Sequence, residues 1–468
     1  TFLLLILILA LSNANSTIRG VPGSYTTIQS AINAANTGDT VLVEPGTYYE
    51  NINFRGKHIV VTSRFYINND LTFIQATTID GSTPLNSDSA SVVIIGSGAD
   101  STTVLQGFRI TGGTGTKWTD EHAAGIYREG GGVLIALSSP VVRFNIIVNN
   151  TAMNISGVNG AGGGGIRSGD GKPKILNNII MNNTAKYGAG IVLNYTGATV
   201  KNNIIFGNSM ASTYSAGAGI WANNVLGTNK NLIENNTIFG NSSLNGTAGI
   251  LSIYSASLII RNNIIWGNTS PGNTQIMPAS GGSVTVTYCD VQNGYAGAGN
   301  INVYPQFTDS NFVLSNSSPC IDAGDSSIIY NDPSDPGNPS NPKFPSKGTL
   351  RNDMGAYGGP LSSVISSVTI IGIQNIKSSL PEGYRMYQNY PNPFNPVTKI
   401  MFAIPKSSFV KISIFDISGR MVETIANQTI NPGGYEVLWN AGKHSSGVYF
   451  CKLETEGFSQ TIKMLLVK

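Results

Sequence analysis

The sequence predicts an all-β protein in which a right-handed parallel β-helix with an N-terminal capping helix is followed by a small C-terminal β-sandwich. The first observation is a phrase, Asn-Ile-Ile-x-x-Asn or a close variant, that occurs five times at intervals of 25 to 33 residues. Repetition at such a period is typical of solenoids, whose repeats stack on one another. The five copies begin at Asn145, Asn178, Asn203, Asn236 and Asn263.

The second observation is that two columns of the aligned copies are entirely β-branched and aliphatic, which favours strands over helices. The columns are Val142, Ile175, Val200, Ile233 and Ile260, before the first Asn, and Ile147, Ile180, Ile205, Ile238 and Ile265, after it. The region has no apolar 3.6-residue periodicity, so stacked helices are not expected. Successive coils should lie about 4.8 Å apart, and right-handedness follows from the crossover preference of parallel strands.

The repeated asparagines are expected to form turns, not a site, because an Asn side chain bonds nearby backbone and tolerates the αL conformation. Asparagines one coil apart can also bond each other, as in cross-β stacks. Through these coils, residues 25–360 resemble the right-handed parallel β-helix repeat proteins, the architecture of pectate lyases and related polysaccharide lyases. The resemblance implies the fold. It says little about catalytic chemistry, because the shared residues form turns and the core.

Composition places the chain among secreted all-β proteins, with 11% charged residues and 55 glycines. The net charge of +3 is too small to suggest nucleic-acid binding. The central coils are mildly cationic, which favours an acidic polymer as partner. Residues 133–300 contain Arg143, Arg167, Lys172, Lys174, Lys186, Lys201, Lys230 and Arg261 against Asp170, Glu234 and Asp290.

The sequence has three cysteines, a small and odd number that does not indicate a disulfide framework. Buried free thiols are expected, with a Cys289–Cys320 pair as the alternative. Residues 1–14 are apolar and end in Ser12-Asn13-Ala14, which predicts a signal peptide cleaved after Ala14. The chain has no initiator Met or basic start, so we expect it to be truncated there. No later segment predicts a membrane span.

Residues 25–36 predict a short amphipathic helix that Thr26 or Thr27 caps. Because an open β-helix end exposes its core, this helix is expected to cover it. The first strands should follow at 40–43 and 46–48, and residues 105–113 predict a degenerate coil.

Long excursions at 114–130, 151–163 and 209–216 take the same place in their coils. Insertions on one edge of a repeat protein often carry binding. The candidate substrate-binding residues on this edge are Trp118, Asp120, Glu121, His122, Arg128, Arg167 and Lys186, with Tyr127, Glu129 and Tyr187 beside them. A uronate lyase uses Arg, Lys, His and Tyr to neutralise a carboxylate and move protons. Solubility alone also explains charged loops.

Two further columns remain open to two interpretations each. Arg143, Leu176, Lys201, Glu234 and Arg261 should point outward, as a solvated face with an ion-pair ladder or as a cationic groove. Val148, Met181, Phe206, Phe239 and Trp266 are either core filler or a platform for stacking sugars. The sequence has no HExxH, metal-spaced Cys/His set or GxSxG motif. No cofactor is expected, although Asp322, Asp325, Asp332, Asp335 and Asp353 suggest Ca²⁺ weakly.

The last part of the sequence carries the most specific resemblance. Residues 361–379 predict a Ser-rich linker. Residues 380–468, with Tyr390-Pro391-Asn392-Pro393-Phe394 and later Ser446-Gly447-Val448-Tyr449, look like the type A sorting domain of type IX secretion. Alternating strands and Pro/Gly turns predict a β-sandwich there. The resemblance implies export across the outer membrane of a Gram-negative bacterium, then surface attachment or release.

Three functions follow as hypotheses. The first is a secreted surface protein, expected to be a monomer, that binds an extracellular and acidic polysaccharide. The second is a lyase or hydrolase of a uronate-containing polymer. The third is an adhesin or passive surface structure. The sequence does not choose the polymer.

Overall fold

Short parallel strands stacked coil on coil make up most of the chain, as the β-branched columns predict. The structure is a computed structural model that describes residues 16–211, 217–308, 311–365, 374–377, 381–395, 397–406, 408–430, 433–441 and 444–467. The chain divides into two units, residues 1–366 and residues 367–468. The predicted signal peptide, residues 1–14, lies outside the described residues.

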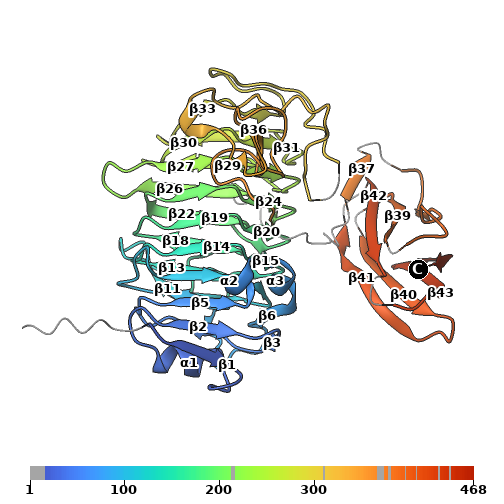
Figure 1. Cartoon of the computed structure of the whole chain (residues 1–468), viewed down its shortest axis with the longest axis horizontal. Helices are drawn as coiled ribbons and strands as arrows, with labels where there is room; N and C mark the ends of the chain where they lie inside the picture. Colours follow the sequence, from blue (N-terminus) through green and yellow to red (C-terminus); the bar gives the residue numbers. More distant parts are fainter. Residues whose placement is uncertain are drawn as a thin grey trace, which may run out of the picture. The chain divides into compact units, whose positions relative to one another are not determined.

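Three long parallel sheets form the walls of the β-helix, and most coils add one short strand to each (Figure 1). Sheet A contains β1 (Ile18–Val21), β2 (Thr40–Val43), β5 (Val60–Ser63), β9 (Val104–Gln106), β14 (Val141–Arg143), β19 (Lys174–Leu176), β23 (Thr199–Lys201), β27 (Asn231–Glu234), β30 (Ser257–Arg261) and β33 (Ser283–Thr287). Sheet B contains β3 (Gly46–Tyr48), β6 (Thr77–Asp80), β10 (Arg109–Thr111), β15 (Ile146–Val148), β20 (Ile179–Met181), β24 (Ile204–Phe206), β28 (Thr237–Phe239), β31 (Ile264–Trp266) and β34 (Asp290–Val291). Sheet C contains β4 (Ile52–Asn53), β8 (Val93–Ile95), β13 (Val133–Ala136), β18 (Ile166–Gly169), β22 (Ile191–Thr196), β26 (Ile220–Val225), β29 (Ile250–Ile253) and β32 (Ile276–Ala279).

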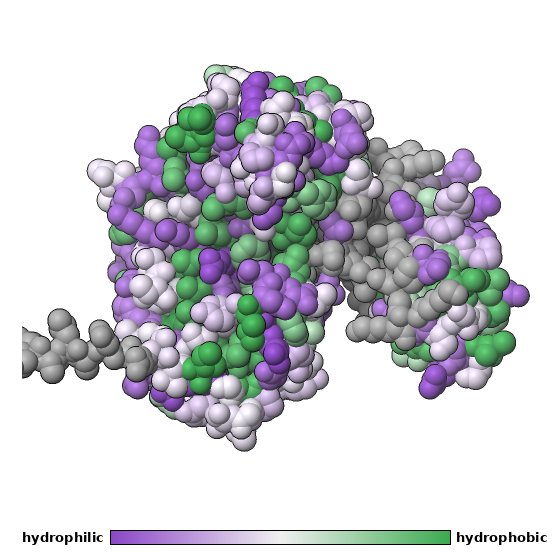
Figure 2. Space-filling model, in the orientation of Figure 1, coloured by the Kyte–Doolittle hydropathy of each residue, from purple (hydrophilic) through white to green (hydrophobic). Residues whose placement is uncertain are grey.

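The predicted columns are in register and fully buried. In sheet A, Ile175 pairs with Val200 and Val200 with Ile233, and in sheet B the isoleucine column pairs in the same way. All ten column residues have no exposed surface and belong to one continuous core. The hydrophobic wall that sequence periodicity predicts is therefore the interior of the β-helix. On the outer face seen in Figure 2, apolar and polar residues are instead interleaved.

Two ladders of buried asparagines run along the axis. Each Asn of the first column donates its backbone N–H and side-chain N–H to the Oδ1 of the Asn one coil later, as from Asn203 to Asn236 at 3.0 Å. The last Asn of each phrase forms a second ladder, as from Asn208 to Asn241. At the end of the first ladder, the backbone N–H of Asn263 donates to Cys289 Sγ at 3.4 Å. All three cysteines are buried free thiols, as expected.

The N-terminal end of the stack is closed by helix α1 (Ile28–Ala34), which lies in the blue part of Figure 1. Thr27 is its N-cap and forms a capping box with Ser30. Ile28, Ala31 and Ile32 are buried against the first coils, as the amphipathic pattern predicts. Two short helices, α2 (Phe65–Asn68) and α3 (Thr72–Ala76), interrupt a later coil.

The predicted insertions build extra sheets on the wall. Sheet D contains β7 (Ser89–Ala90), β11 (Gly115–Thr119), β12 (Ile126–Glu129) and β17 (Gly160–Gly162), so the excursions at 114–130 and 151–163 pair with each other. Sheet E contains β16 (Thr151–Ala152), β21 (Thr184–Ala185) and β25 (Ser209–Met210). Part of the third excursion, 212–216, lies outside the described residues.

We call residues 301–365, apart from 309–310, the strap, because they leave the coil pattern and lie back along the outside of the β-helix. The strap contains the 3-10 helix η1 (Ile328–Tyr330) and the strands β35 (Ser334–Asp335) and β36 (Asn338–Pro342). It covers the aromatic column of sheet B, since Phe312 packs 5.2 Å from both Phe206 and Phe239, centroid to centroid. The column is therefore filler under the strap, and the sugar-platform interpretation is wrong.

The second unit is a sandwich of two antiparallel sheets, as predicted. One sheet contains β37 (Gln374–Lys377), β42 (Gly433–Asn440), β39 (Val397–Ile404) and β38 (Arg385–Met386), and the other β41 (Met421–Ile430), β40 (Ser408–Asp416), β43 (Gly447–Thr455) and β44 (Phe458–Leu466). Ile400, Ile412 and Trp439 lie in its core. Regular structure enters the predicted linker 361–379, because residues 374–377 form β37 and pair with β42.

Candidate functional site

The hairpin β11–β12 is the element that brings the predicted site residues to the outer face of sheet C. Strand β12 runs directly into β13 through Gly130, Gly131 and Gly132. Gly130 has φ +66, and a Cβ there would approach Leu134 to 2.7 Å, so the chain reverses only with glycine at this position. The hairpin consequently lies over the outer face of β13 and β18.

Beneath the hairpin, Arg167 is completely buried. Its Nε lies 2.7 Å from Glu129 Oε2, and its Nη2 lies 3.5 Å from Glu121 Oε2. Tyr187 donates its hydroxyl to Glu129 at 2.8 Å, and Trp118 donates its indole N–H to Glu121 at 2.8 Å. We call these five residues the ion cluster, and within it every charge faces a partner.

The pKa shifts within the ion cluster follow from burial and from the charges that face one another. Burial raises the pKa of Glu129, and the Arg167 guanidinium opposes that rise. Burial also lowers the pKa of Arg167, but the two glutamates outweigh it, so the net pKa shift is upward. The guanidinium is therefore charged, and the 2.7 Å contact with Glu129 is a buried ion pair. Burial raises the pKa of Tyr187 well above its usual value, which keeps its hydroxyl a donor.

The hairpin tip reaches the far end of the sheet C strands. His122 Nε2 lies 2.9 Å from Asp170 Oδ1, and its ring stacks on Tyr195 with centroids 3.5 Å apart. Asp120 accepts the Asn194 amide at 3.3 Å and the backbone N–H of His122 at 2.9 Å. These contacts join the hairpin tip to the turn that leads from sheet C to sheet A.

That turn recurs in successive coils and forms the turn edge, defined as Asp170, Tyr195, Asn224 and Tyr254. Each lies four residues after the aligned Ile that begins its sheet C strand, and each has φ between 51° and 56°. The αL conformation is common for Asn but unfavourable for a bulky ring. Tyr254 is 51% exposed. Tyrosines in this position are strained, a feature that concentrates at functional sites.

Two exposed lysines flank the turn edge. Lys172 follows Asp170 in its turn, and Lys230 lies in the turn after Asn224. Among the described residues, neither ammonium group has a hydrogen bond or ion pair. The nearby Asp120 and Asp170 carboxylates already face the Asn194 amide and the His122 imidazole. The turn edge thus offers two free cations together with partnered carboxylates.

The structure brings only part of the predicted site together. Trp118, Glu121 and Arg167 meet in the ion cluster, and Asp120 and His122 meet the turn edge. Arg128 points elsewhere, because its guanidinium donates to Thr114 and to the Ser87 carbonyl. Lys186 follows β21 and donates its backbone N–H to Ala161 of β17. The turn edge itself was missed, although its four residues share one position relative to the sheet C isoleucines.

The outward column of sheet A is an ion-pair ladder, one of its two predicted interpretations. Lys201 Nζ lies 2.5 Å from Glu234, and Arg261 lies 4.0 Å from the same carboxylate. Glu234 is only 5% exposed, so the column is less solvated than predicted. Of the eight Arg and Lys residues in the central coils, Lys201 and Arg261 are paired in this ladder, and Arg167 is paired in the ion cluster.

The strap aspartates bind backbone. Asp353 accepts the N–H groups of Asp322 and Lys347, both at 2.8 Å. Burial raises the pKa of Asp332 to about 8 and that of Asp353 to about 7. Within the described residues, no three His, Cys, Asp or Glu side chains gather as a metal-ligand set. The Ca²⁺ prediction stays a prediction.

Comparisons with known proteins bear on the second unit. Residues 388–468 match the family model described as a secretion system C-terminal sorting domain. Searching the curated proteins gave no match. None of the helices in the described ranges is long and apolar enough to span a membrane.

One solved structure is similar over a short stretch. It is PorZ, an essential bacterial surface component of the type IX secretion system of Porphyromonas gingivalis, with 20% identity over 26% of this chain and a TM-score of 0.14. The chain spans 14% of that protein's length, so this likeness carries no argument about fold or activity. The family match confirms the sorting-domain prediction: the chain carries a type IX secretion sorting domain, and the protein is secreted and either attached to the cell surface or released.

Proposed function

We propose that this protein binds an extracellular, acidic polysaccharide along the turn edge after export to the cell surface. The observation that carries the proposal is the placement of two tyrosines at strained positions of one turn column, Tyr195 and Tyr254, beside two unpaired lysines. Secretion places this edge where extracellular polymers are.

The spacing of the turn edge suits a polymer that lies along the axis. Tyr195 and Tyr254 are two coils apart, which corresponds to about 10 Å at the interstrand spacing of parallel strands. That distance is about the length of a disaccharide, so alternate sugar rings would meet Tyr254 and the stacked pair of Tyr195 and His122. Tyrosine supplies an apolar face for a sugar ring and a hydroxyl for hydrogen bonding. Lys172 and Lys230 would face the carboxylates of a uronate polymer.

Binding without cleavage fits the ion cluster better than lyase chemistry does. The predicted site cation Arg167 is buried and paired with Glu129, so it is not available to a substrate carboxylate. The His122–Asp170 pair has the form of an oriented base, but the His122 ring stacks on Tyr195.

The test is binding of the purified secreted protein to pectate, alginate and glycosaminoglycans, with neutral glycans for comparison. We expect Tyr254→Ala combined with Lys172→Glu and Lys230→Glu to weaken binding at least about tenfold, and added salt to weaken it too. Tyr49→Ala with Lys343→Glu is the matched control, because both residues are exposed and lie elsewhere on the β-helix unit. Unchanged binding by the triple variant would overturn the site. Unsaturated uronate absorbance in the same incubations would favour the lyase.

A further inference from the structure

At four successive coils the strap contacts the same turn position, an asparagine in the αL conformation between sheet A and sheet B. The four are Asn177, Asn202, Asn235 and Asn262. The coils on either side have an aromatic residue at this position. Asn202 donates its amide to the strap carbonyls of Ala356 and Gly358 at 3.0 and 2.7 Å, and Asn177 donates to the Leu361 carbonyl at 3.0 Å.

The contacts follow the strap from the last coils toward the middle of the stack. Asn262 Oδ1 accepts the Asp325 N–H at 2.8 Å. One coil earlier, Asn235 donates to the Asp353 carbonyl and to Asn352 Oδ1, both at 3.0 Å. The asparagine amides of this column therefore form hydrogen bonds with the strap backbone in each of the four coils.

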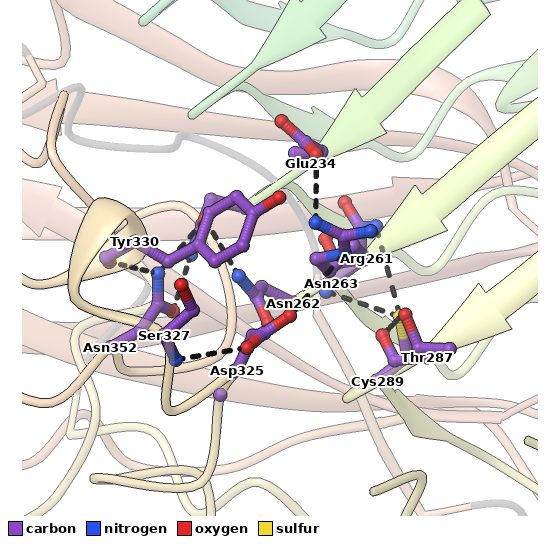
Figure 3. A network of polar contacts seen from close by, with 12 residues as sticks. Glu234, Arg261, Asn262, Asn263, Thr287, Cys289, Asp325, Ser327, Tyr330 and Asn352 are labelled. Carbon is purple, nitrogen blue, oxygen red and sulfur yellow. Dashed lines mark hydrogen bonds and ion pairs between the residues drawn. The ribbon is translucent and has the colours of Figure 1, made fainter. Parts of the chain in front are cut away.

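Figure 3 shows the beginning of this path, where Asp325 approaches Asn262 and Tyr330 lies over Arg261. The Arg261 guanidinium is 4.7 Å from the centre of the Tyr330 ring. A cation over an aromatic face adds an attraction that does not depend on the amide column. The first part of the strap is thus attached to sheet A as well as to the turn beside it.

Close approach of the strap depends on glycine. Gly355 has φ +94, and a Cβ there would come within 2.7 Å of Ile264 Cδ1. Gly359 has φ +77, and a Cβ there would come within 2.6 Å of Asn235 Oδ1. The residue after Gly355 also bonds the wall, because the Ala356 N–H donates to Thr237 Oγ1 at 3.1 Å.

The strap is also braced internally, by buried carboxylates. Asp332 accepts the N–H groups of Gly359 and Asp353, and Asp353 accepts those of Asp322 and Lys347. Segments from both ends of the strap are therefore tied to each other as well as to the wall.

We infer that the strap is a clamp that makes coils 174–291 unfold as one cooperative unit. In a solenoid each coil contacts only its neighbours, so the end coil opens first and the rest follow in order. The strap adds contacts that skip coils, since it ties Asn262 in a late coil to Asn177 three coils earlier. Opening the late coils then requires loss of the contacts at the earlier ones.

The test is amide hydrogen exchange of the full chain, followed by mass spectrometry. In the natural protein we expect peptides from β20, β24, β28, β31 and β34 to share one protection factor. Asn202→Asp with Asn235→Asp replaces amide donors by carboxylate oxygens that face carbonyls, while Asp still tolerates αL geometry. In this variant β34 and β31 should exchange at least about tenfold faster than β20. Asn149→Asp is the control, because Asn149 has φ +56 but is exposed and lies outside the column that the strap contacts.

A gradient of protection already present in the natural protein would overturn the inference. So would a double variant whose late coils keep the protection of β20. If the double variant does not fold, Thr237→Val removes the acceptor of the Ala356 N–H without changing side-chain shape. That variant should show the same gradient at a smaller size, about threefold, and uniform exchange in it would equally overturn the clamp.

Discussion

The strap and the hairpin β11–β12 both leave the coils and lie on the outer wall of the β-helix, but they are attached to it differently. The strap has one ion pair to the wall, from Asp325 to Arg261 at 3.7 Å, and is otherwise held largely by neutral amide-to-carbonyl bonds that are distributed along the αL asparagine column. The hairpin is held by buried charge, with Arg167 between Glu129 and Glu121. The difference is in distribution: the side-chain contacts of the strap are spread over four coils, whereas the buried side-chain contacts of the hairpin, beyond its strand pairing in sheet D, are concentrated at Arg167.

A concentrated attachment is vulnerable to one substitution, because removing one partner leaves the other charge buried and unpaired. A distributed attachment loses only a fraction of its bonds at a time. The comparison predicts a ranking of effects, which the following experiments test from the largest to the smallest.

Arg167→Met should produce the largest loss on the hairpin side. The buried Glu129 carboxylate loses its charged partner, and we expect the free energy of unfolding to fall by about 3–5 kcal/mol. Denaturant unfolding measures it, with the exposed Lys172→Met as control, expected within about 0.5 kcal/mol of the natural protein. Adding Glu129→Gln to Arg167→Met should recover part of the loss. A loss below that of an ordinary surface substitution would contradict the concentrated attachment.

Asp290, where the strap meets the last coil, should make stability depend on pH. It accepts the Cys320 thiol at 3.2 Å and the Val303 N–H, and burial raises its pKa to about 6. The folded state therefore keeps a proton that the unfolded state releases near pH 4. The contribution of this group to stability should be highest below about pH 4 and fall by up to about 3 kcal/mol as pH rises from about 4 to about 6. Unfolding measured from pH 4 to 8 should be flatter in Asp290→Asn, and equal slopes would refute this.

Asn236→Ala probes the neutral ladder inside the wall that carries both attachments. Its Oδ1 accepts two bonds from Asn203, and its amide donates to Val200 and Asn263. Leaving these buried groups unpaired should cost about 2–3 kcal/mol. Thermal unfolding measures it against the exposed Asn154→Ala. A cost equal to that of Arg167→Met would remove the distinction between distributed and concentrated bonding.

His122→Ala should have the smallest effect. The His122–Asp170 pair is partly exposed, with 36% of the His122 side chain accessible, and such pairs contribute about 0–1 kcal/mol. We expect nearly unchanged global unfolding but faster hydrogen exchange in residues 120–125. Asp170→Asn should resemble it. A large global loss would show that the hairpin depends on its tip and not on the ion cluster.

Part of the candidate site was open to prediction from the sequence. The excursion at 114–130 and its charged residues were identified, because an insertion interrupts a repeat and is visible as such. The sequence does not distinguish Arg128 from Arg167. In the structure Arg128 donates to the Ser87 carbonyl, and Arg167 is buried against Glu129. Arg128 lies in the hairpin, where side-chain direction depends on a pairing register that no repeat specifies. Arg167 lies on a regular coil strand and is buried because the hairpin covers it.

The sequence by itself determined the β-helix wall, the asparagine ladders, the capping helix and the sorting domain. Each depends on local preference repeated at a fixed period or on a specific motif, so neighbouring coils reproduce the same contact. Only the tertiary structure decided that Arg167 is buried, that the strap covers Phe206 and Phe239, and that the hairpin tip reaches Asp170 and Asn194. Those contacts join residues that occur once and lie far apart in the chain, and the position of a unique segment on a repetitive wall is set by packing alone.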